Sequence, residues 1–148
     1  KKAIRSALAA TLDKNVVKKR GHLFTELPSV IDSKIEAFSK TKQVIDLMTK
    51  LGLEKELARL QIKKIRPGRG KLRNRPYRKK VGPLFVVSGK CALYKAASNI
   101  SGVEVCVVNN LNAHLLAPGT EPGRLTIYTD KALEKMDKEK LFLVKETK

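Results

Sequence analysis

The spacing of hydrophobic positions divides the chain into a helical first half and a second half that alternates between two kinds of segment. In the first half, apolar residues recur at intervals of three and four, which is the spacing of an amphipathic helix. The longest such segment opens on Ser33 and Glu36, whose separation matches a capping box, and it stops before Gly52. The pattern predicts helices over residues 2–12, 13–20, 33–51 and 53–61, and a short strand at 27–31.

Short, continuous apolar runs mark the second half. They lie at residues 84–87, 103–108 and 125–128, and their branched and aromatic content is typical of strands that are buried on both faces. Strands and helices that alternate along a chain need crossover connections, which favour a parallel sheet. The helical segments that separate and follow the strands lie at residues 91–98, 110–117 and 129–136.

We therefore predict a single α/β domain over residues 1–148. A mostly parallel sheet of about four strands, the segment near Val30 included, has helices on both faces and forms three layers. The segment at residues 63–80 is the exception, because it contains prolines and glycines and almost no apolar side chains. It cannot contribute to a core, so we expect an irregular basic arm inserted between the helical and sheet segments.

Charge adds most to this picture. The 148 residues carry 32 Lys and Arg against 14 Asp and Glu, a net charge of +18, while the 42% hydrophobic content is normal for a globular domain. Residues 61–80 hold ten basic and no acidic side chains, residues 1–20 hold seven basic and one acidic, and the remaining 108 residues have a net charge of +2. Charge concentrated in this way is tolerated where phosphates neutralise it, which indicates a nucleic-acid partner.

Several other classes of protein fit the sequence poorly. No apolar run approaches the roughly 18 residues of a membrane span. The Gly68-Arg69-Gly70 segment follows no strand and lacks a third glycine, so it does not match a dinucleotide-binding loop. Ser88-Gly89-Lys90 follows a strand, but it lacks the first glycine and the Ser or Thr of a P-loop. We expect no membrane partner, no small-molecule substrate and no cofactor.

Candidate catalytic and metal-ligating residues are few. Cys91 and Cys106 lack the spacing of a zinc ribbon or a disulfide framework and fit a reducing cytosol, and both suit buried packing positions. His22 follows Gly21 and is expected at a turn or on the surface, and a lone His114 on a short helix cannot build a metal site. We expect neither enzymatic activity nor a metal ion.

In the arm, Arg and Lys alternate with Gly and Pro. Glycine lets backbone amides approach phosphates closely, and arginine forks onto two phosphate oxygens or stacks on a base. Tyr77 offers a face for an unpaired base, and Asn74 offers hydrogen bonds to a base edge or a 2′-hydroxyl. No helix-turn-helix or zinc-finger pattern is present, so the arm suits structured RNA better than the major groove of DNA.

Several short segments resemble one protein family in the same order along the chain. The segments are Arg5-Ser6-Ala7-Leu8-Ala9-Ala10-Thr11, Arg20-Gly21-His22, Pro67-Gly68-Arg69-Gly70, Arg73-Asn74-Arg75, Leu116-Ala117-Pro118-Gly119, Pro122-Gly123-Arg124 and Thr129. Together they resemble the fourth universal protein of the large ribosomal subunit, in its archaeal and eukaryotic form, over most of the 148 residues. The stop at Lys148, soon after the last helix, favours the archaeal form.

This resemblance implies a structural constituent of the large ribosomal subunit, without catalytic activity and located in the cytoplasm. It implies large-subunit ribosomal RNA and neighbouring ribosomal proteins as partners. The glycines of the arm would let the RNA backbone approach the chain. The RNA-binding residues would be Lys63, Lys64, Arg66, Gly68, Arg69, Gly70, Lys71, Arg73, Asn74, Arg75, Tyr77, Arg78, Lys79 and Lys80 in the arm, with Lys1, Lys2, Arg5 and Arg124 outside it.

Full members of the family also carry an N-terminal region and a long extension that reaches the peptide exit tunnel. We expect this chain to lack both, because it begins where that extension would end. Two alternatives remain open at the level of sequence. One is an RNA-modifying or nucleotide-dependent enzyme with a Rossmann-like core and a basic arm. The other is a chromatin-type DNA-binding protein.

Overall fold

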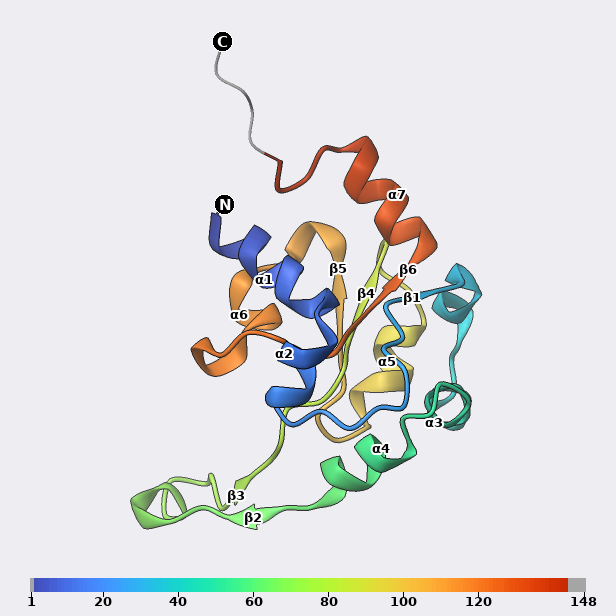
Figure 1. Cartoon of the computed structure of the whole chain (residues 1–148). Coiled ribbons are helices and arrows are strands. Elements are labelled where there is room, and N and C mark those ends of the chain that lie inside the picture. Colours follow the sequence, from blue (N-terminus) through green and yellow to red (C-terminus); the bar gives the residue numbers. More distant parts are fainter. Residues whose placement is uncertain (1, 144–148) are drawn as a thin grey trace.

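A four-stranded parallel sheet lies at the centre of the computed structural model, which describes residues 2–143 (Figure 1). The strands are β1 (Val30–Ile31), β4 (Leu84–Val87), β5 (Glu104–Val107) and β6 (Thr126–Thr129). They lie in the order β1-β6-β4-β5, and Leu84 of β4 lies opposite Glu104 of β5 and Thr126 of β6. The predicted α/β class with a mostly parallel sheet is confirmed.

Helices cover both faces of the sheet, because each strand directs alternate side chains to opposite faces. In β4, Leu84 and Val86 join one apolar cluster, whereas Phe85 and Val87 join the other, and all four are buried. The three predicted layers follow from this alternation. The first cluster includes α1 (Lys2–Leu12), α6 (Ala113–Leu116) and α7 (Asp130–Lys138), and the second includes α3 (Thr41–Lys50), α4 (Glu54–Gln61) and α5 (Leu93–Ser98).

The prediction of one helix over residues 33–51 is wrong, because this segment forms two elements. A short 3-10 helix, η1 (Ser33–Ala37), is separated from α3 by an extended segment. Glu36, expected to close a capping box, instead accepts hydrogen bonds from Ser88 and Thr129 at the ends of β4 and β6. The hydrogen bonds of Glu36 to residues at the ends of the strands therefore take the place of the capping box that the local sequence predicts.

Most other predicted elements lie within a few residues of their expected positions. The segment at 13–20 forms α2 (Lys14–Lys19), whose first turn is capped by the Asp13 carboxylate. The segment at 103–108 is a strand as predicted, but it is not buried on both faces, because β5 lies at an edge of the sheet and Glu104 is exposed. None of the described helices is both long and apolar enough to cross a lipid bilayer.

Candidate nucleic-acid interface

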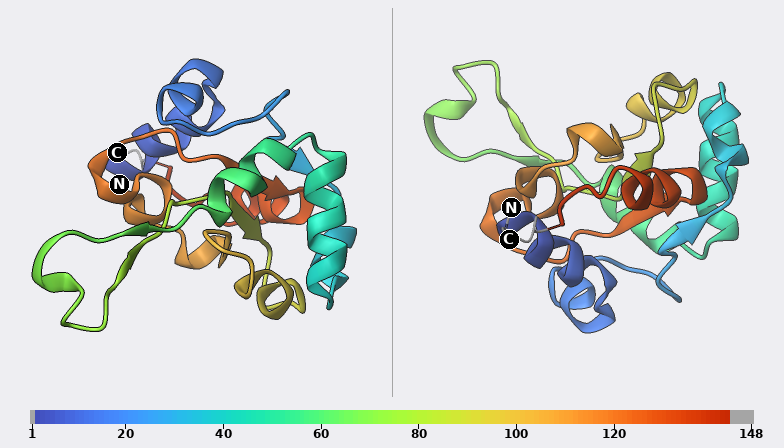
Figure 2. Two further views of the ribbon diagram at one scale, coloured as in Figure 1. Left: turned by 90° about the horizontal axis from the view of Figure 1, so that it is seen from below. Right: turned by 90° about the horizontal axis from the view of Figure 1, so that it is seen from above.

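A two-stranded antiparallel ribbon carries the basic arm away from the body of the molecule (Figures 1 and 2). Lys64 lies opposite Arg78 in this ribbon, and Ile65 lies opposite Tyr77. Neighbouring side chains on a strand point to opposite faces, so one face of the ribbon is basic and the other is apolar. The base of the arm is thus more regular than its composition predicts. The elements are β2 (Lys64–Ile65), η2 (Gly68–Gly70) and β3 (Tyr77–Arg78).

The outer end of the arm is a loop closed by its own backbone. The Arg66 amide donates to the Pro76 carbonyl at 2.8 Å, and the Arg75 amide donates to the Gly70 carbonyl at 3.0 Å. A Cβ atom at Gly70 would lie 2.5 Å from Cδ of Arg66, and Asn74 adopts a left-handed backbone conformation with φ of 55°. Glycine and asparagine are the residues that tolerate such a tight turn.

Nearly all the cations of the arm face solvent. Of the ten basic side chains between residues 63 and 80, Arg66 and Lys80 are half-buried and the other eight are exposed. Within the described part of the chain, none of the ten takes part in an ion pair. Unneutralised charge at this density favours a polyanion, because phosphate contacts release condensed counterions.

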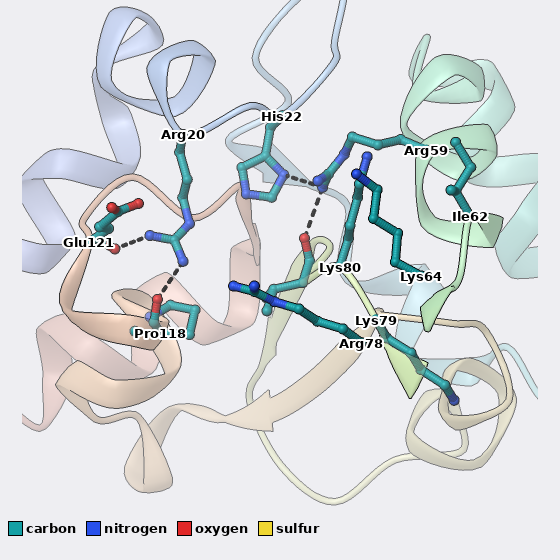
Figure 3. Close-up of a pocket in the computed structure, with 12 residues that line it drawn as sticks. Arg20, His22, Arg59, Ile62, Lys64, Arg78, Lys79, Lys80, Pro118 and Glu121 are labelled. Atoms are coloured by element: carbon teal, nitrogen blue, oxygen red, sulfur yellow. Dashed lines mark hydrogen bonds between the residues drawn. The ribbon is translucent and has the colours of Figure 1, made fainter. Parts of the chain in front are cut away.

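The base of the arm meets the body in an open cleft of about 600 Å³ (Figure 3). The arm supplies four cations, including Arg78, which extends from β3 into the cleft. Arg20 follows α2 and contributes from the body, opposite the turn η4 (Pro118–Thr120). Six Lys and Arg side chains line the cleft against the single carboxylate of Glu121, so its potential is strongly positive.

Backbone carbonyls hold Arg20 in place. Its Nη2 donates to the Pro118 carbonyl at 2.6 Å, and its Nη1 donates to the Glu121 carbonyl (Figure 3). Burial lowers the pKa of the guanidinium, which nevertheless stays charged at neutral pH. Arg20 is not among the residues predicted from the sequence to bind RNA. The motif Arg20-Gly21-His22 marks it, but a motif alone does not reveal which surface the side chain faces.

A buried ionic cluster beneath the cleft joins the base of the arm to the body. Glu56 of α4 accepts hydrogen bonds from His22 Nδ1 at 2.7 Å, the Leu23 amide at 2.9 Å and Arg59 Nε at 2.8 Å. Arg59 Nη2 also donates to the Val81 carbonyl at 2.8 Å, where the arm returns to the sheet (Figure 3). Burial acts to raise the pKa of Glu56, but these hydrogen bonds outweigh it and lower the pKa to about 2.

The position of His22 corrects its prediction as a turn or surface group. Its side chain is buried, with the residue 3% exposed, and it belongs to the Glu56 cluster. The Nδ1 atom lies 2.7 Å from Glu56 and 3.2 Å from Arg59 Nη2. Because the Arg59 nitrogen already donates to Glu56 and Val81, we assign the Nδ1 proton to the bond with Glu56.

Two glycines allow the chain leaving the arm to lie directly against the loop before β5. The Gly82 amide donates to the Gly102 carbonyl at 2.8 Å, and a Cβ atom at Gly82 would lie 2.6 Å from Cδ1 of Leu60. Gly102 has φ of +77°, and a Cβ there would lie 2.7 Å from the Lys80 carbonyl oxygen. This close contact fixes the direction in which the arm leaves the body.

The burial of Arg124 corrects its prediction as an RNA-binding residue. The residue is 1% exposed, so its guanidinium has no free surface for a phosphate. Its Nε donates to the Gly82 carbonyl at 2.9 Å, and its Nη1 donates to the Leu115 carbonyl at 2.9 Å and to Glu104 at 2.8 Å. Arg124 therefore holds the end of the arm to β5 and α6 from inside the body.

The N-terminal cations lie apart from the arm. Lys2 is exposed and Arg5 is half-buried on α1, which packs against α2 and α6. In Figure 1 this helix lies on the left of the upper half of the molecule, whereas the arm projects from the bottom. Lys1 is outside the described residues. Lys2 and Arg5 therefore lie on a surface separate from the arm, whereas Arg20, from the same N-terminal segment, lines the cleft with the arm.

The carboxyl ends of the parallel strands, where doubly wound sheets bind nucleotides, hold a carboxylate in this chain. Glu36 accepts hydrogen bonds from the Ser88 amide at 3.0 Å, the Ser88 hydroxyl at 2.9 Å and the Thr129 hydroxyl at 2.8 Å. Burial acts to raise the pKa of Glu36, but these bonds outweigh it and hold the pKa below its usual value. A negative charge here repels phosphate, which argues against the nucleotide-dependent enzyme.

The cysteines are not activated for chemistry. Cys91 is half-buried and Cys106 is buried, and burial raises the pKa of both thiols, which disfavours the reactive thiolate. His114 is exposed on α6. Within residues 2–143, no three His, Cys, Asp or Glu side chains gather closely enough to hold a metal ion.

Known proteins resemble this chain along most of its length. The model of the ribosomal protein L4/L1 family matches residues 1–139. A Methanosphaera stadtmanae protein named large ribosomal subunit protein uL4 is 49% identical over 138 residues, which cover 90% of this chain and 53% of that protein. The uL4 protein of Nanoarchaeum equitans is 49% identical over 142 residues, which cover 95% of this chain and 53% of that protein. The uL4 protein of Archaeoglobus fulgidus is 43% identical over 136 residues, which cover 90% of this chain and 54% of that protein.

The chain thus spans about half the length of the curated relatives it matches. The resemblance inferred from short motifs is confirmed by the extent of these matches. Because the family model covers residues 1–139 and the relatives are 43% to 49% identical, the chain belongs to the ribosomal protein L4/L1 family.

Proposed function

We propose that this chain is a structural, non-catalytic constituent of the large ribosomal subunit in the cytoplasm, and that it binds large-subunit ribosomal RNA through the arm and the cleft at its base. The family and the names of the relatives support the ribosomal role. The observation that carries RNA binding is the charge of the arm, whose ten cations have no ion-pair partner within the described residues. Neighbouring ribosomal proteins are the other expected partners.

The arm and the cleft suit different parts of a folded RNA. At the outer loop, exposed Arg69, Arg73 and Arg75 reach phosphates on more than one strand, and Gly68 and Gly70 admit the RNA backbone. At the base, the cleft is wide enough for a sugar–phosphate segment, and its cations come from both the arm and the body. The RNA therefore bridges two parts of the protein, which fixes the orientation of the arm.

Filter binding to a labelled fragment of large-subunit ribosomal RNA tests this proposal. The double variant Arg73→Ala/Arg75→Ala should weaken binding by tenfold or more, because two phosphate contacts are lost. The matched control is Lys42→Ala/Lys50→Ala, which removes the same charge from exposed positions of α3, outside the arm and the cleft. Equal losses in the two variants would show that binding follows net charge alone and would contradict the proposed site.

Competition experiments separate the alternatives. An excess of duplex DNA should displace little of the labelled RNA, whereas unlabelled folded ribosomal RNA should displace all of it. Preference for the duplex would favour a chromatin-type DNA-binding protein. Binding of S-adenosylmethionine or a nucleotide in calorimetry would favour the enzyme and would contradict the role assigned to Glu36.

A further inference from the structure

An apolar groove of about 860 Å³ runs along the outer edge of β5, and it shares no lining residue with the cleft. We call it the edge groove. Strand β5 forms its floor, α5 forms one wall and Leu115 of α6 belongs to the other. In Figure 1 the sheet is seen almost edge-on, with α6 to its left and α5 to its right. The RNA-binding function proposed above makes no use of this surface.

The backbone of β5 is open toward the groove. In a parallel ladder, residues alternate between bonding to one neighbouring strand and facing the other side. The Glu104 amide donates to the Pro83 carbonyl at 3.1 Å, on the side of β4. The amides of Val105 and Val107 therefore point away from β4, and no strand lies beyond β5 in the described sheet. Such an edge is a template for another strand.

The side chains around this edge form an apolar surface that suits a peptide. Val105 and Val107 are half-buried and pack on the α5 side of the sheet, while Cys106 is buried on the α6 side. Tyr94 of α5 borders the groove and is 57% exposed. An incoming strand would cover this aromatic ring and the two valines at once.

The rim of the groove carries uncompensated positive charge. Lys90 and Lys95 both border it and are exposed, and neither forms an ion pair within the described residues. Glu104 is the one carboxylate among the residues that line the groove, and Arg124 neutralises it at 2.8 Å. The charge of the rim therefore favours an acidic occupant.

We propose that the edge groove binds an extended segment of a partner protein, in which apolar and acidic residues alternate, and that this segment pairs with β5 as a fifth strand of the sheet. The open amides give main-chain hydrogen bonds, the apolar floor takes alternate side chains, and Lys90 and Lys95 select acidic residues at the others. RNA matches the lysines but not the apolar floor or the open strand edge. This inference does not depend on RNA binding by the arm.

The probe for the first test is a displayed library of random eight-residue peptides, selected on the whole chain in the presence of excess ribosomal RNA. We expect enrichment of peptides that alternate apolar and acidic residues. Synthetic copies of these peptides should bind at least tenfold more weakly to Lys90→Glu/Lys95→Glu and unchanged to Lys42→Glu/Lys50→Glu. No enrichment, or enrichment that ignores the two groove lysines, would overturn the proposal.

The second test measures whether a bound peptide covers the open edge of β5. Bound peptide should slow hydrogen exchange at the amides of Val105 and Val107, and it should slow alkylation of Cys91, which borders the groove. Val105→Pro removes an outward amide and leaves the bonds to β4 in place, so it should abolish binding. If Val105→Pro fails to fold, peptide binding by Lys90→Glu/Lys95→Glu, which changes only exposed residues, is the deciding measurement. Protection of Cys91 by the ribosomal RNA fragment instead of the peptide would make the groove an RNA surface and refute the proposal.

Discussion

At the scale of single residues, the Glu56 cluster shows how a buried carboxylate is kept charged in the body of a basic protein. Desolvation alone would favour the neutral acid, yet four hydrogen bonds from three residues, His22, Leu23 and Arg59, surround the carboxylate. The donors come from the loop after α2 and from α4, and Arg59 continues the contact to Val81. One residue therefore connects two helices to the base of the arm.

Because the pKa of Glu56 falls from 4.5 to about 2 on folding, its contribution to stability is complete above pH 4.5. It is lost as the pH falls from 4.5 through about 2, and a shift of this size corresponds to about 3 kcal/mol. We expect Glu56→Gln to lower the free energy of unfolding at pH 7 by about 3 kcal/mol and to flatten its dependence on pH below 4.5. Urea denaturation at a series of pH values measures both effects.

The control for this experiment is Glu54→Gln, an exposed carboxylate at the start of the same helix. It should change the free energy of unfolding by less than about 0.5 kcal/mol. If Glu56→Gln retained the acid sensitivity of the unmodified chain, the carboxylate would not be the group that titrates, and the role of the cluster would be wrong.

A variant of Arg124 tests whether stability and the proposed RNA binding depend on different arginines. Replacing it with Met leaves the buried Gly82 carbonyl and the partly buried Leu115 carbonyl without a donor, so we expect a loss of about 3 kcal/mol in the free energy of unfolding. Well below its melting temperature, the variant should bind RNA with the same salt dependence as the unmodified chain. Arg75→Ala, in the exposed loop, should do the reverse. A changed salt dependence in Arg124→Met would restore Arg124 as a phosphate contact.

His22, Glu36 and Arg124 also show where sequence reasoning stops. Each is polar, each looks like a surface, capping or RNA-binding residue from its neighbours along the chain, and each is explained by partners on distant elements. Spacing along the chain predicts side chains that share one helix or strand. It carries no information about which polar groups of different elements meet in the folded state.

At the scale of elements, the glycines at the base of the arm decide where the arm can lie. We expect Gly82→Ala to lower the free energy of unfolding by about 1 to 3 kcal/mol, because the added Cβ would lie 2.9 Å from the Gly102 carbonyl oxygen. The matched control is Gly89→Ala, where nothing lies within 4 Å of the added atom and the change should be small. Thermal melting of both variants measures the difference. Equal stability would mean that the contact with Gly102 relaxes freely.

The elements that the sequence predicts well are those buried on a defined face. The continuous run of β4 and the short helices that pack beside it follow directly from hydrophobic spacing. The arm is different, because its ribbon is held by a few backbone bonds between residues of no apolar pattern. Its charge predicts a nucleic-acid-binding surface, but the cleft that includes Arg20 depends on the fold around it.

At the scale of the whole molecule, the net charge of +18 divides between a nearly neutral body and two basic segments, residues 1–20 and 61–80, which come together where Arg20 lines the cleft with cations of the arm. The body folds around two apolar clusters, which need no counter-charge from RNA. The arm and cleft, by contrast, gather cations that repel one another unless anions neutralise them. This division explains how one chain forms a stable core and still carries so much positive charge.

The same division predicts how the proposed RNA binding depends on salt. If about six arm cations contact phosphates, the logarithm of the association constant should fall against the logarithm of salt concentration with a slope of about −4 to −5. Arg73→Ala/Arg75→Ala should reduce the size of that slope by about 1.5, and Lys42→Ala/Lys50→Ala should leave it unchanged. Filter binding from 50 to 300 mM KCl gives the slopes. A slope near zero, or equal slopes in the arm variant and the unmodified chain, would mean that the arm does not meet phosphates and that RNA contacts another surface.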